Sequence, residues 1–316
     1  MRLLIIYGKG MLMGIADLVP GVSGGTIALI TGLYQELIVS IDNLKFSSLK
    51  VIFQQGLGSF WKKINGPFLS AVFGGILTSV LLFSRLVEYL IENETIRLWS
   101  FFFGLLIASI VYLIQKNKIF SPKNIGLLLL GIVFSYSVTL ITPAVVDASY
   151  LYLFFCGVIA ISAMILPGLS GAYLLIILGT YKVILSNIRK AQDLVFSFDQ
   201  QQLFEVFFSL GTFILGIGIG IKLFSRILRW LLDKKPQQTL AVLIGLMTGA
   251  IHKIWPWQME ILTKEESTNP IRTQAVWPDQ WKSDPQLWSA LILFLLGFFL
   301  LFGLEQFKSK INDQGN

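Results

Sequence analysis

Long apolar runs separated by short polar segments recur along the whole chain. Each run is close to the roughly 20 residues that a helix needs to cross the hydrocarbon core of a bilayer. The clearest runs cover residues 68–83, 98–114, 125–141, 150–166, 207–221 and 287–304. The strict alternation of apolar and polar residues that marks membrane-spanning strands is absent. The pattern therefore predicts an all-α polytopic membrane protein.

Composition agrees with this fold class. Of the 316 residues, 54% are hydrophobic and 14% are charged, against about a quarter charged in soluble domains. The net charge of +7 is explained by lysines and arginines on cytoplasmic loops, so we expect no nucleic-acid partner. The single cysteine, Cys156, lies inside an apolar run and has no second thiol for an internal disulfide.

The chain contains the same pattern twice. Residues 10–34 read GMLMGIADLVPGVSGGTIALITGLY and residues 157–181 read GVIAISAMILPGLSGAYLLIILGTY, an offset of 147 positions. A second match joins LLFSRLVEYL at 81–90 to KLFSRILRWL at 222–231, an offset of 141 positions. Matched blocks that keep their order indicate that the chain consists of two homologous halves.

The two halves, 1–145 and 146–316, are each expected to hold a re-entrant helical hairpin followed by three transmembrane helices. Lys9, Asp17 and a Pro-Gly break make the start of the chain short and polar for a full span. Non-helical backbone at membrane depth is tolerated only where protein or a cavity surrounds it, which favours a re-entrant hairpin; two full spans remain the alternative. For the first half we expect a re-entrant hairpin 3–41, an interfacial helix 44–64 and spans 67–91, 96–115 and 124–141. For the second half we expect a re-entrant hairpin 149–186 and spans 206–230, 238–256 and 286–304.

An odd number of crossings in each half places the second half upside down relative to the first. With the N-terminus in the cytoplasm, the loops rich in lysine and arginine fall on the cytoplasmic side and the acidic loops fall outside, as the positive-inside rule requires. Both termini are then cytoplasmic. Inverted-topology repeats with interrupted helices are typical of secondary transporters, whose substrate site lies near the bilayer midplane.

The interrupted segments carry the motif Pro-Gly-x-Ser-Gly in both halves. We call residues 20–26 tip one and residues 167–171 tip two. The helices that follow begin at these tips, so their unpaired N–H groups and partial positive charge face each other at the midplane, which suits a phosphate. The candidate ligands for this anion are Pro20, Gly21, Ser23, Gly24, Gly25, Thr26, Pro167, Gly168, Ser170 and Gly171. Tight-turn chemistry with small residues for helix packing is the alternative.

Tip one also matches G-x-S-x-G, the pattern around many serine nucleophiles. An intramembrane serine hydrolase needs a base on a neighbouring helix, and His252 is the only histidine in the chain. It lies close to Trp255 and Trp257, where an interfacial anchor is the ordinary explanation. The sequence has no Cys/His cluster for a metal and no Walker loop for a nucleotide. We therefore expect no catalysis, no metal and no cofactor, and we keep a serine hydrolase as the alternative from another class.

Three charged residues near the expected spans are further candidates. Asp17 lies three residues before Pro20, and a carboxylate at this depth is a functional candidate by default, here for proton coupling. Capping of backbone N–H groups at the turn is the equal alternative. Arg85 and Arg226 occupy matching places in the repeat, where each binds an anionic headgroup at its own face or anchors its helix by snorkelling.

The segments MGIADLVPGVSGGTIALITGLY and ISAMILPGLSGAYLLIILGTY resemble the bacterial polyprenyl-phosphate (undecaprenyl phosphate) transporter family, PopT. The resemblance implies a flippase that returns undecaprenyl phosphate from the outer to the inner leaflet of the bacterial plasma membrane for envelope glycan synthesis. It also implies that the two tips form the headgroup site. Tip two departs from tip one, because Ala172 and Tyr173 replace Gly25 and Thr26, and Met164 replaces Asp17.

The resemblance and the residues together predict alternating access, in which one half rocks against the other. The alternative within transport is a carrier of a small soluble anion, which would use the same tips. The choice between a lipid and a soluble anion depends on whether the substrate cavity opens sideways to the membrane.

Overall fold

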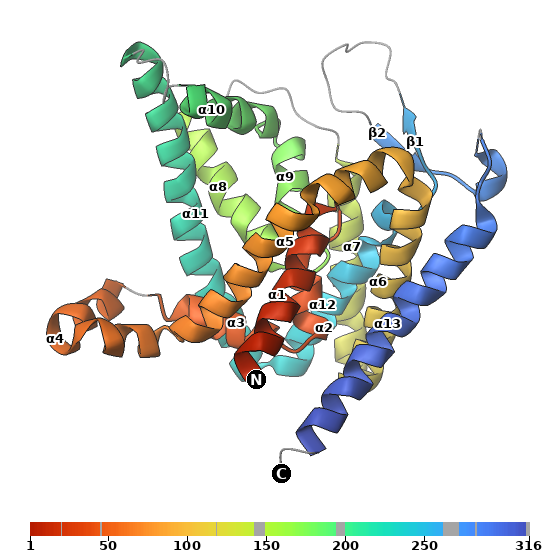
Figure 1. Ribbon diagram of the computed structural model, residues 1–316, viewed down its shortest axis with the longest axis horizontal. Coiled ribbons are helices and arrows are strands. Elements are labelled where there is room, and N and C mark those ends of the chain that lie inside the picture. The colour runs from red at the N-terminus through yellow and green to blue at the C-terminus, as the bar shows by residue number, and fades with distance from the viewer. Residues whose placement is uncertain are drawn as a thin grey trace.

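The chain is helical almost throughout in the computed structural model (Figure 1). The structure describes residues 1–19, 21–44, 46–117, 119–141, 149–193, 200–261, 272–281 and 283–313. One feature, a short two-stranded sheet, differs from the all-α expectation. Strand β1 (Gln258–Ile261) pairs antiparallel with β2 (Arg272–Ala275), in the polar segment between the last two long helices, where no apolar run commits the chain to a helix.

The helices follow the same order in both halves of the chain. The first half has α1 (Arg2–Leu18), α2 (Gly24–Ile30), α3 (Tyr34–Asp42), α4 (Phe46–Lys63), α5 (Gly66–Asn93), α6 (Thr95–Asn117) and α7 (Pro122–Leu140). The second has α8 (Tyr150–Ile165), α9 (Gly171–Ile177), α10 (Tyr181–Asp193), α11 (Gln200–Lys234), α12 (Pro236–Gly249), the 3₁₀ turns η1 (Ile251–Ile254) and η2 (Pro278–Gln280), and α13 (Leu287–Asp313). Among the described residues, 4 helices are long and apolar enough to cross a membrane, or up to 6 if each bent pair counts as one span.

Local signals set where several helices begin. The hydroxyl of Ser121 accepts a hydrogen bond from the Asn124 N–H at the start of α7, and Ser149 does the same at the start of α8. Serine is favoured at this position because it satisfies one of the free amides of the first turn. Pro122 and Pro236 follow as the first residues of α7 and α12, where a missing N–H costs nothing.

Each hairpin is more broken than the sequence indicated. We expected one outgoing half-helix after each tip, but α2 and α3 are bent by 115° and α9 and α10 by 109°. The breaks fall at Gly32 and Gly179, whose φ angles are +77° and +68°. A left-handed glycine ends a helix because other residues rarely adopt that conformation. The two glycines are matched in the sequence repeat, so the extra bend is matched as well.

The expected interfacial helix is also interrupted. Within α4, Gly56 has a φ of +82° and a ψ of 168°, so the helix is two segments joined at a kink. In Figure 1 these segments project from the body of the molecule beside the start of α5. Phe53 and Leu57 are exposed there, which fits a helix whose apolar side lies in a membrane surface.

Four close helix pairs form the body of the molecule: α1 with α5, α8 with α11, α7 with α12, and α6 with α13. In each pair a glycine of one helix lies against the backbone of the other: Gly75 against α1, Gly216 against α8, Gly245 against α7 and Gly297 against α6. Any side chain at these positions would collide with a backbone carbonyl. Small residues of this kind let helices approach closely where no hydrophobic effect drives association.

The pairing scheme is unchanged when the halves are exchanged. By order in the chain, α1, α5, α6 and α7 correspond to α8, α11, α12 and α13. The pair α1/α5 then becomes α8/α11, and the pair α6/α13 becomes α12/α7. The last two pairs join one half to the other, so the halves interlock around the tips.

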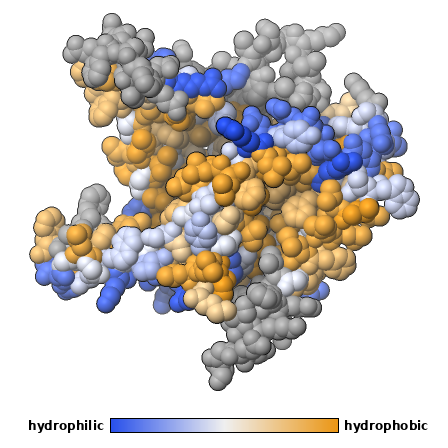
Figure 2. Space-filling model, viewed as in Figure 1, coloured by the Kyte–Doolittle hydropathy of each residue, from blue (hydrophilic) through white to orange (hydrophobic). Residues whose placement is uncertain are grey.

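The outer surface is apolar over its middle. Figure 2 shows hydrophobic side chains over the central part of the molecule and hydrophilic ones toward its edges. Large apolar side chains are exposed along α5, α7 and α11, including Leu81, Val133 and Ile214. The N-terminus and the end of α13 lie at the same end of the molecule, and α10 and the β-hairpin lie at the other (Figure 1). We call these the N-terminal end and the hairpin end.

Candidate functional site

The two tips meet inside the molecule. The backbone N–H of Gly168 donates a hydrogen bond to the Thr26 hydroxyl at 3.1 Å, and the Ser23 hydroxyl lies 3.5 Å from the Leu166 carbonyl oxygen. These contacts join residues more than 140 positions apart. Pro20 lies outside the described residues, so tip one is described from Gly21 onward.

The two tips have the same shape, and this shape follows from their sequence motif. Gly21 and Gly168 have φ angles of +86° and +84°, a conformation that glycine adopts without strain. Ser23 then caps α2 by accepting a hydrogen bond from the Gly25 N–H at 3.2 Å, and Ser170 caps α9 by accepting one from the Tyr173 N–H at 3.4 Å. Each serine therefore accepts a hydrogen bond from a backbone N–H group that we expected to bind the anion.

Asp17 caps the same helix from a different side. Its Oδ1 accepts a hydrogen bond from the Gly24 N–H at 2.6 Å. A Cβ at position 24 would collide with this carboxylate, which gives Gly24 a packing reason to be glycine. Of the two explanations left open for Asp17, the structure shows the capping contact. In tip two the counterpart residue is Met164, which has no carboxylate for such a contact.

The space between the tips is small in this conformation. A cavity of about 10 Å³ lies there, lined by Gly21, Ser23, Thr26 and Gly168 together with residues of α6 and η1. That is room for about one water molecule. The N–H groups of Gly24, Gly25, Gly168 and Tyr173 all have partners within the protein. In this conformation the N–H groups that we expected to bind an anion are therefore enclosed and paired within the protein, and their role as anion ligands remains a prediction.

A second cavity of about 110 Å³ begins at Asp17 and Gly25 and runs between the helix pairs α1/α5 and α8/α11. Its other lining residues are apolar except for Tyr34: Met13, Leu37, Ile38, Ile41, Val72, Phe73, Ile76, Ile161, Met164, Ile165 and Ile221. Phe73 on α5 and Met164 on α8 are 51% and 50% exposed, so the rim of the cavity lies on the outer, apolar surface of the molecule.

Tyr34 adds an unsatisfied polar group to this apolar cavity. The residue is 3% exposed, and its hydroxyl is buried with no hydrogen-bond partner in the described part of the chain. A buried hydroxyl without a partner is costly and therefore calls for an explanation. Sequence reasoning singled out Tyr34 only by its match to Tyr181 in the repeat.

The structure does not bring Arg85 and Arg226 to the tips. Both side chains are exposed, and neither lines either cavity. Their expected role as headgroup ligands at the two faces remains a prediction.

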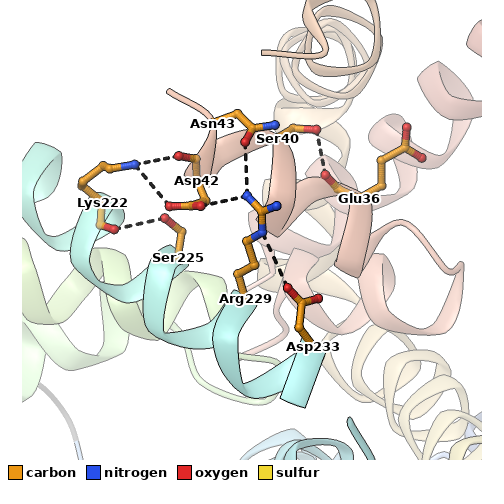
Figure 3. Close-up of polar contacts among 8 residues, drawn as sticks. All are labelled: Glu36, Ser40, Asp42, Asn43, Lys222, Ser225, Arg229 and Asp233. Carbon is orange, nitrogen blue, oxygen red and sulfur yellow. Dashed lines mark hydrogen bonds and ion pairs between the residues drawn. The ribbon is translucent and has the colours of Figure 1, made fainter. Parts of the chain in front are cut away.

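Two other basic residues of α11, Lys222 and Arg229, surround the buried Asp42 of α3 in a cluster that sequence reasoning missed (Figure 3). The side chain of Asp42 is 3% exposed, and its two oxygens lie 3.2 Å from Lys222 Nζ and 2.9 Å from an Arg229 nitrogen. Lys222 also donates to the Asp42 carbonyl oxygen at 2.6 Å, and Arg229 donates to the Asn43 side-chain oxygen at 3.2 Å. The available signal was the spacing of Lys222 and Arg229, two helical turns apart on one face of α11.

His252 serves a structural role in this conformation. Its Nε2 lies 2.8 Å from the Thr139 hydroxyl and its Nδ1 lies 3.2 Å from the Gly249 carbonyl oxygen. Both ring nitrogens therefore have partners other than the tip serines. The histidine–serine pair that a serine hydrolase requires is not assembled among the described residues.

Comparison with known proteins supplies relatives. The family model described as "VCA0040-like: Undecaprenyl phosphate translocase-like" matches residues 13–271. A polyprenyl-phosphate transporter of Vibrio cholerae serotype O1 is 38% identical over 318 residues, which cover 98% of this chain and 98% of that protein. A polyprenyl-phosphate transporter of Staphylococcus aureus is 30% identical over 260 residues, which cover 78% of this chain and 84% of that protein. No solved structure matches the chain.

These matches cover both tips, both cavities and most of the helix pairs. They confirm the family that the tip sequences resemble. The chain belongs to the undecaprenyl phosphate translocase-like family.

Proposed function

We propose that this protein is a flippase for polyprenyl phosphate, which returns undecaprenyl phosphate from the outer to the inner leaflet of the bacterial plasma membrane. The names of the two relatives support the lipid. The observation that carries the proposal is the apolar cavity beside tip one, whose lining residues Phe73 on α5 and Met164 on α8 are exposed on the apolar outer surface. A carrier of a soluble anion has no use for an apolar cavity at this surface, so the lipid is the better substrate.

The cavity suits the part of the lipid nearest its phosphate. Its volume of about 110 Å³ approaches the roughly 150 Å³ of an apolar cavity that holds benzene, enough for about one five-carbon isoprene unit. The rest of the chain would extend past Phe73 and Met164 into the bilayer. Asp17 and Gly25, which line the cavity beside tip one, mark where the phosphate would lie.

The phosphate would bind at the two tips after they separate. In this proposal Gly21, Ser23, Gly24, Gly25 and Thr26 contribute donors and close backbone approach from tip one, with Pro20 before them. Pro167, Gly168, Ser170 and Gly171 do the same from tip two, and Arg85 and Arg226 receive the headgroup at the two faces.

Asp17 holds the place of the substrate while the site is closed. Its carboxylate occupies the Gly24 N–H as a resident negative charge, and a phosphate cannot approach it without strong repulsion. Proton uptake by Asp17 would remove the repulsion and release the N–H. In this proposal Asp17 both caps α2 and couples transport to a proton, so the two explanations of this residue are compatible.

The motion we propose is alternating access between two inverted repeats, residues 1–145 and 146–316, with both termini cytoplasmic. The exchange symmetry of the helix pairs and the position of both termini at one end support this arrangement. One half rocks against the other, and the tips are exposed to each leaflet in turn.

A vesicle assay tests the function. The purified protein is reconstituted with undecaprenyl phosphate, and a membrane-impermeant phosphatase outside the vesicles reports how much lipid reaches the outer leaflet, with and without a pH difference. We expect the whole pool to become accessible with protein, and only the outer-leaflet share without it. Parallel vesicles loaded with inorganic phosphate should retain it. Release of phosphate without lipid movement would favour the soluble-anion carrier, and an accessible pool no larger than in protein-free vesicles would refute the flippase.

A pair of variants tests the cavity. Met164→Trp places a large side chain at the cavity rim, and we expect it to slow lipid movement strongly. Phe155→Trp is the matched control, because Phe155 is equally exposed on the same helix and does not line the cavity. Equal rates in the two variants would contradict a lipid route through this cavity.

A further inference from the structure

The four helix pairs map onto one another when the two halves are exchanged, but the contacts of α3 and α10, the last helices of the two re-entrant segments, do not. Helix α3 of the first half packs against α11 of the second. Its counterpart α10 packs against α11 of its own half, and no comparable contact joins α10 to α5 within the described residues. Helix α3 thus closes against the other half at the N-terminal end, and α10 makes no matching contact at the hairpin end (Figure 1).

The closed contact is held by charge. Asp42 on α3 is buried between Lys222 and Arg229 of α11, as Figure 3 shows. A buried carboxylate is stable only while cations and hydrogen bonds compensate its lost hydration. Separation of α3 from α11 requires that these charge-assisted contacts break, so the cluster holds this end shut.

The sequence repeat assigns counterparts to these residues. The offset of 147 positions that matches the tips carries Asp42 to Arg189 on α10, and the offset of 141 positions that matches the Phe-Ser-Arg blocks carries Arg229 to Glu88 on α5. The counterparts are again one acid and one base, but their places are exchanged: the base, Arg189, is on α10, and the acid, Glu88, is on α5. The same offset of 141 positions carries Lys222 to Leu81, so the reversed pair corresponds to one of the two ion pairs of Asp42.

In the present conformation neither counterpart is paired within the part of the chain that the structure describes. Glu88 and Arg189 are both exposed, and neither has an ion pair with another described residue. Both lie on elements that reach the hairpin end, where α10 makes no matching contact among the described residues.

We infer that Glu88 and Arg189 form a second latch, which closes the hairpin end when the Asp42 latch at the N-terminal end opens. This inference rests on the proposed alternating-access function. The two latches give the two conformations different sets of contacts, which is what a two-state transition requires.

Distances between spin labels test the latch without any lipid. Labels are placed on Leu86→Cys in α5 and Leu185→Cys in α10, both exposed positions, in a Cys156→Ala background that removes the native thiol. We expect a long distance to predominate in this background, with a minor population at a shorter distance. Asp42→Asn should raise the ratio of a shorter distance to the long one about tenfold, within the usual range for coupled states.

Two further variants separate the latch from a general loosening. Glu88→Gln added to Asp42→Asn should abolish the shorter distance, and Glu88→Arg with Arg189→Glu, added to Asp42→Asn, should restore it. Lys190→Gln is the matched control, since Lys190 is the neighbouring base on α10 and lies 3.9 Å from Glu205. It should leave the distances unchanged.

Two outcomes overturn the inference: no shorter distance after Asp42→Asn, or a shorter distance that persists with Glu88→Gln. Because the readout needs no transport, failure here with lipid movement intact in the vesicle assay removes the latch alone. The expected distance changes without lipid movement would keep the latch and remove the proposed function.

Discussion

The capping contact of Asp17 leads to a prediction about coupling that two substitutions test. Asp17→Asn keeps an oxygen that accepts the Gly24 N–H but removes the negative charge and the ability to bind a proton. Asp17→Ala removes the acceptor as well and leaves the N–H of a buried glycine without a partner. The two variants therefore separate the structural contact from the charge.

The magnitudes follow from the geometry. The contact is 2.6 Å long and charge-assisted, and hydrogen bonds to charged groups contribute about 1.5–3 kcal/mol. Asp17→Ala should lower the free energy of unfolding by about that amount. Asp17→Asn keeps a neutral hydrogen bond and loses the interaction with the start of α2, about 0.3–1 kcal/mol at a helix terminus. Thermal unfolding in detergent should rank the wild type first, Asp17→Asn second and Asp17→Ala last.

Transport should rank the variants differently. In the vesicle assay, a pH difference should accelerate lipid movement by the wild type and should have no effect on Asp17→Asn, because the amide takes up no proton. Asp17→Asn should still move lipid, since the Gly24 N–H is no longer held by a charged group. A pH response in Asp17→Asn equal to that of the wild type would refute the coupling role. Equal stability of Asp17→Asn and Asp17→Ala would refute the assigned hydrogen bond.

Three further substitutions test the tips and the cavity. Gly168→Ala should destabilise the protein by about 2–4 kcal/mol in thermal unfolding, since φ is +84° and the new Cβ would lie 2.7 Å from Met247 Cα, which combines backbone strain with overpacking; Gly211→Ala, which meets open space, should be nearly neutral. Ser23→Ala should cost about 1 kcal/mol as the loss of a cap and slow lipid movement without abolishing it, whereas a serine hydrolase would lose all activity. Tyr34→Phe removes a buried hydroxyl that has no partner among the described residues, so it should raise the unfolding temperature or leave it unchanged, and a clear fall would show that the hydroxyl makes a contact in the folded protein.

Much of the fold could be predicted from hydrophobic pattern alone. Apolar runs of bilayer length predict helices because the backbone must satisfy its own hydrogen bonds in lipid. The turns at Gly21 and Gly168 could also be predicted, because Pro-Gly-x-Ser-Gly combines a helix stop, a left-handed residue and a helix cap in five positions. The bends at Gly32 and Gly179 were missed, since a single glycine within an apolar run reads equally well as part of a straight helix.

The site was harder to predict, for a reason specific to membrane proteins. Hydropathy shows that a charged residue near a span needs a partner, but it does not show which helix supplies the partner. Asp42 stands in a segment where Lys45, Lys50, Lys62 and Lys63 are nearer in sequence, yet its partners Lys222 and Arg229 are about 180 positions away. The close approach of α3 to α11 decides the pairing.

The sequence by itself determined that the chain is a helical membrane protein with a doubled plan, broken at two glycine-rich tips, because hydropathy, helix caps and internal repetition are local properties of the chain. The tertiary structure decided what those tips do at rest. It brought them into contact, paired their N–H groups with Asp17, Thr26 and the tip serines, left room for about one water and placed the larger apolar cavity beside tip one. These outcomes depend on which helices pack together and how closely, and that is set by contacts between distant residues that no local pattern encodes.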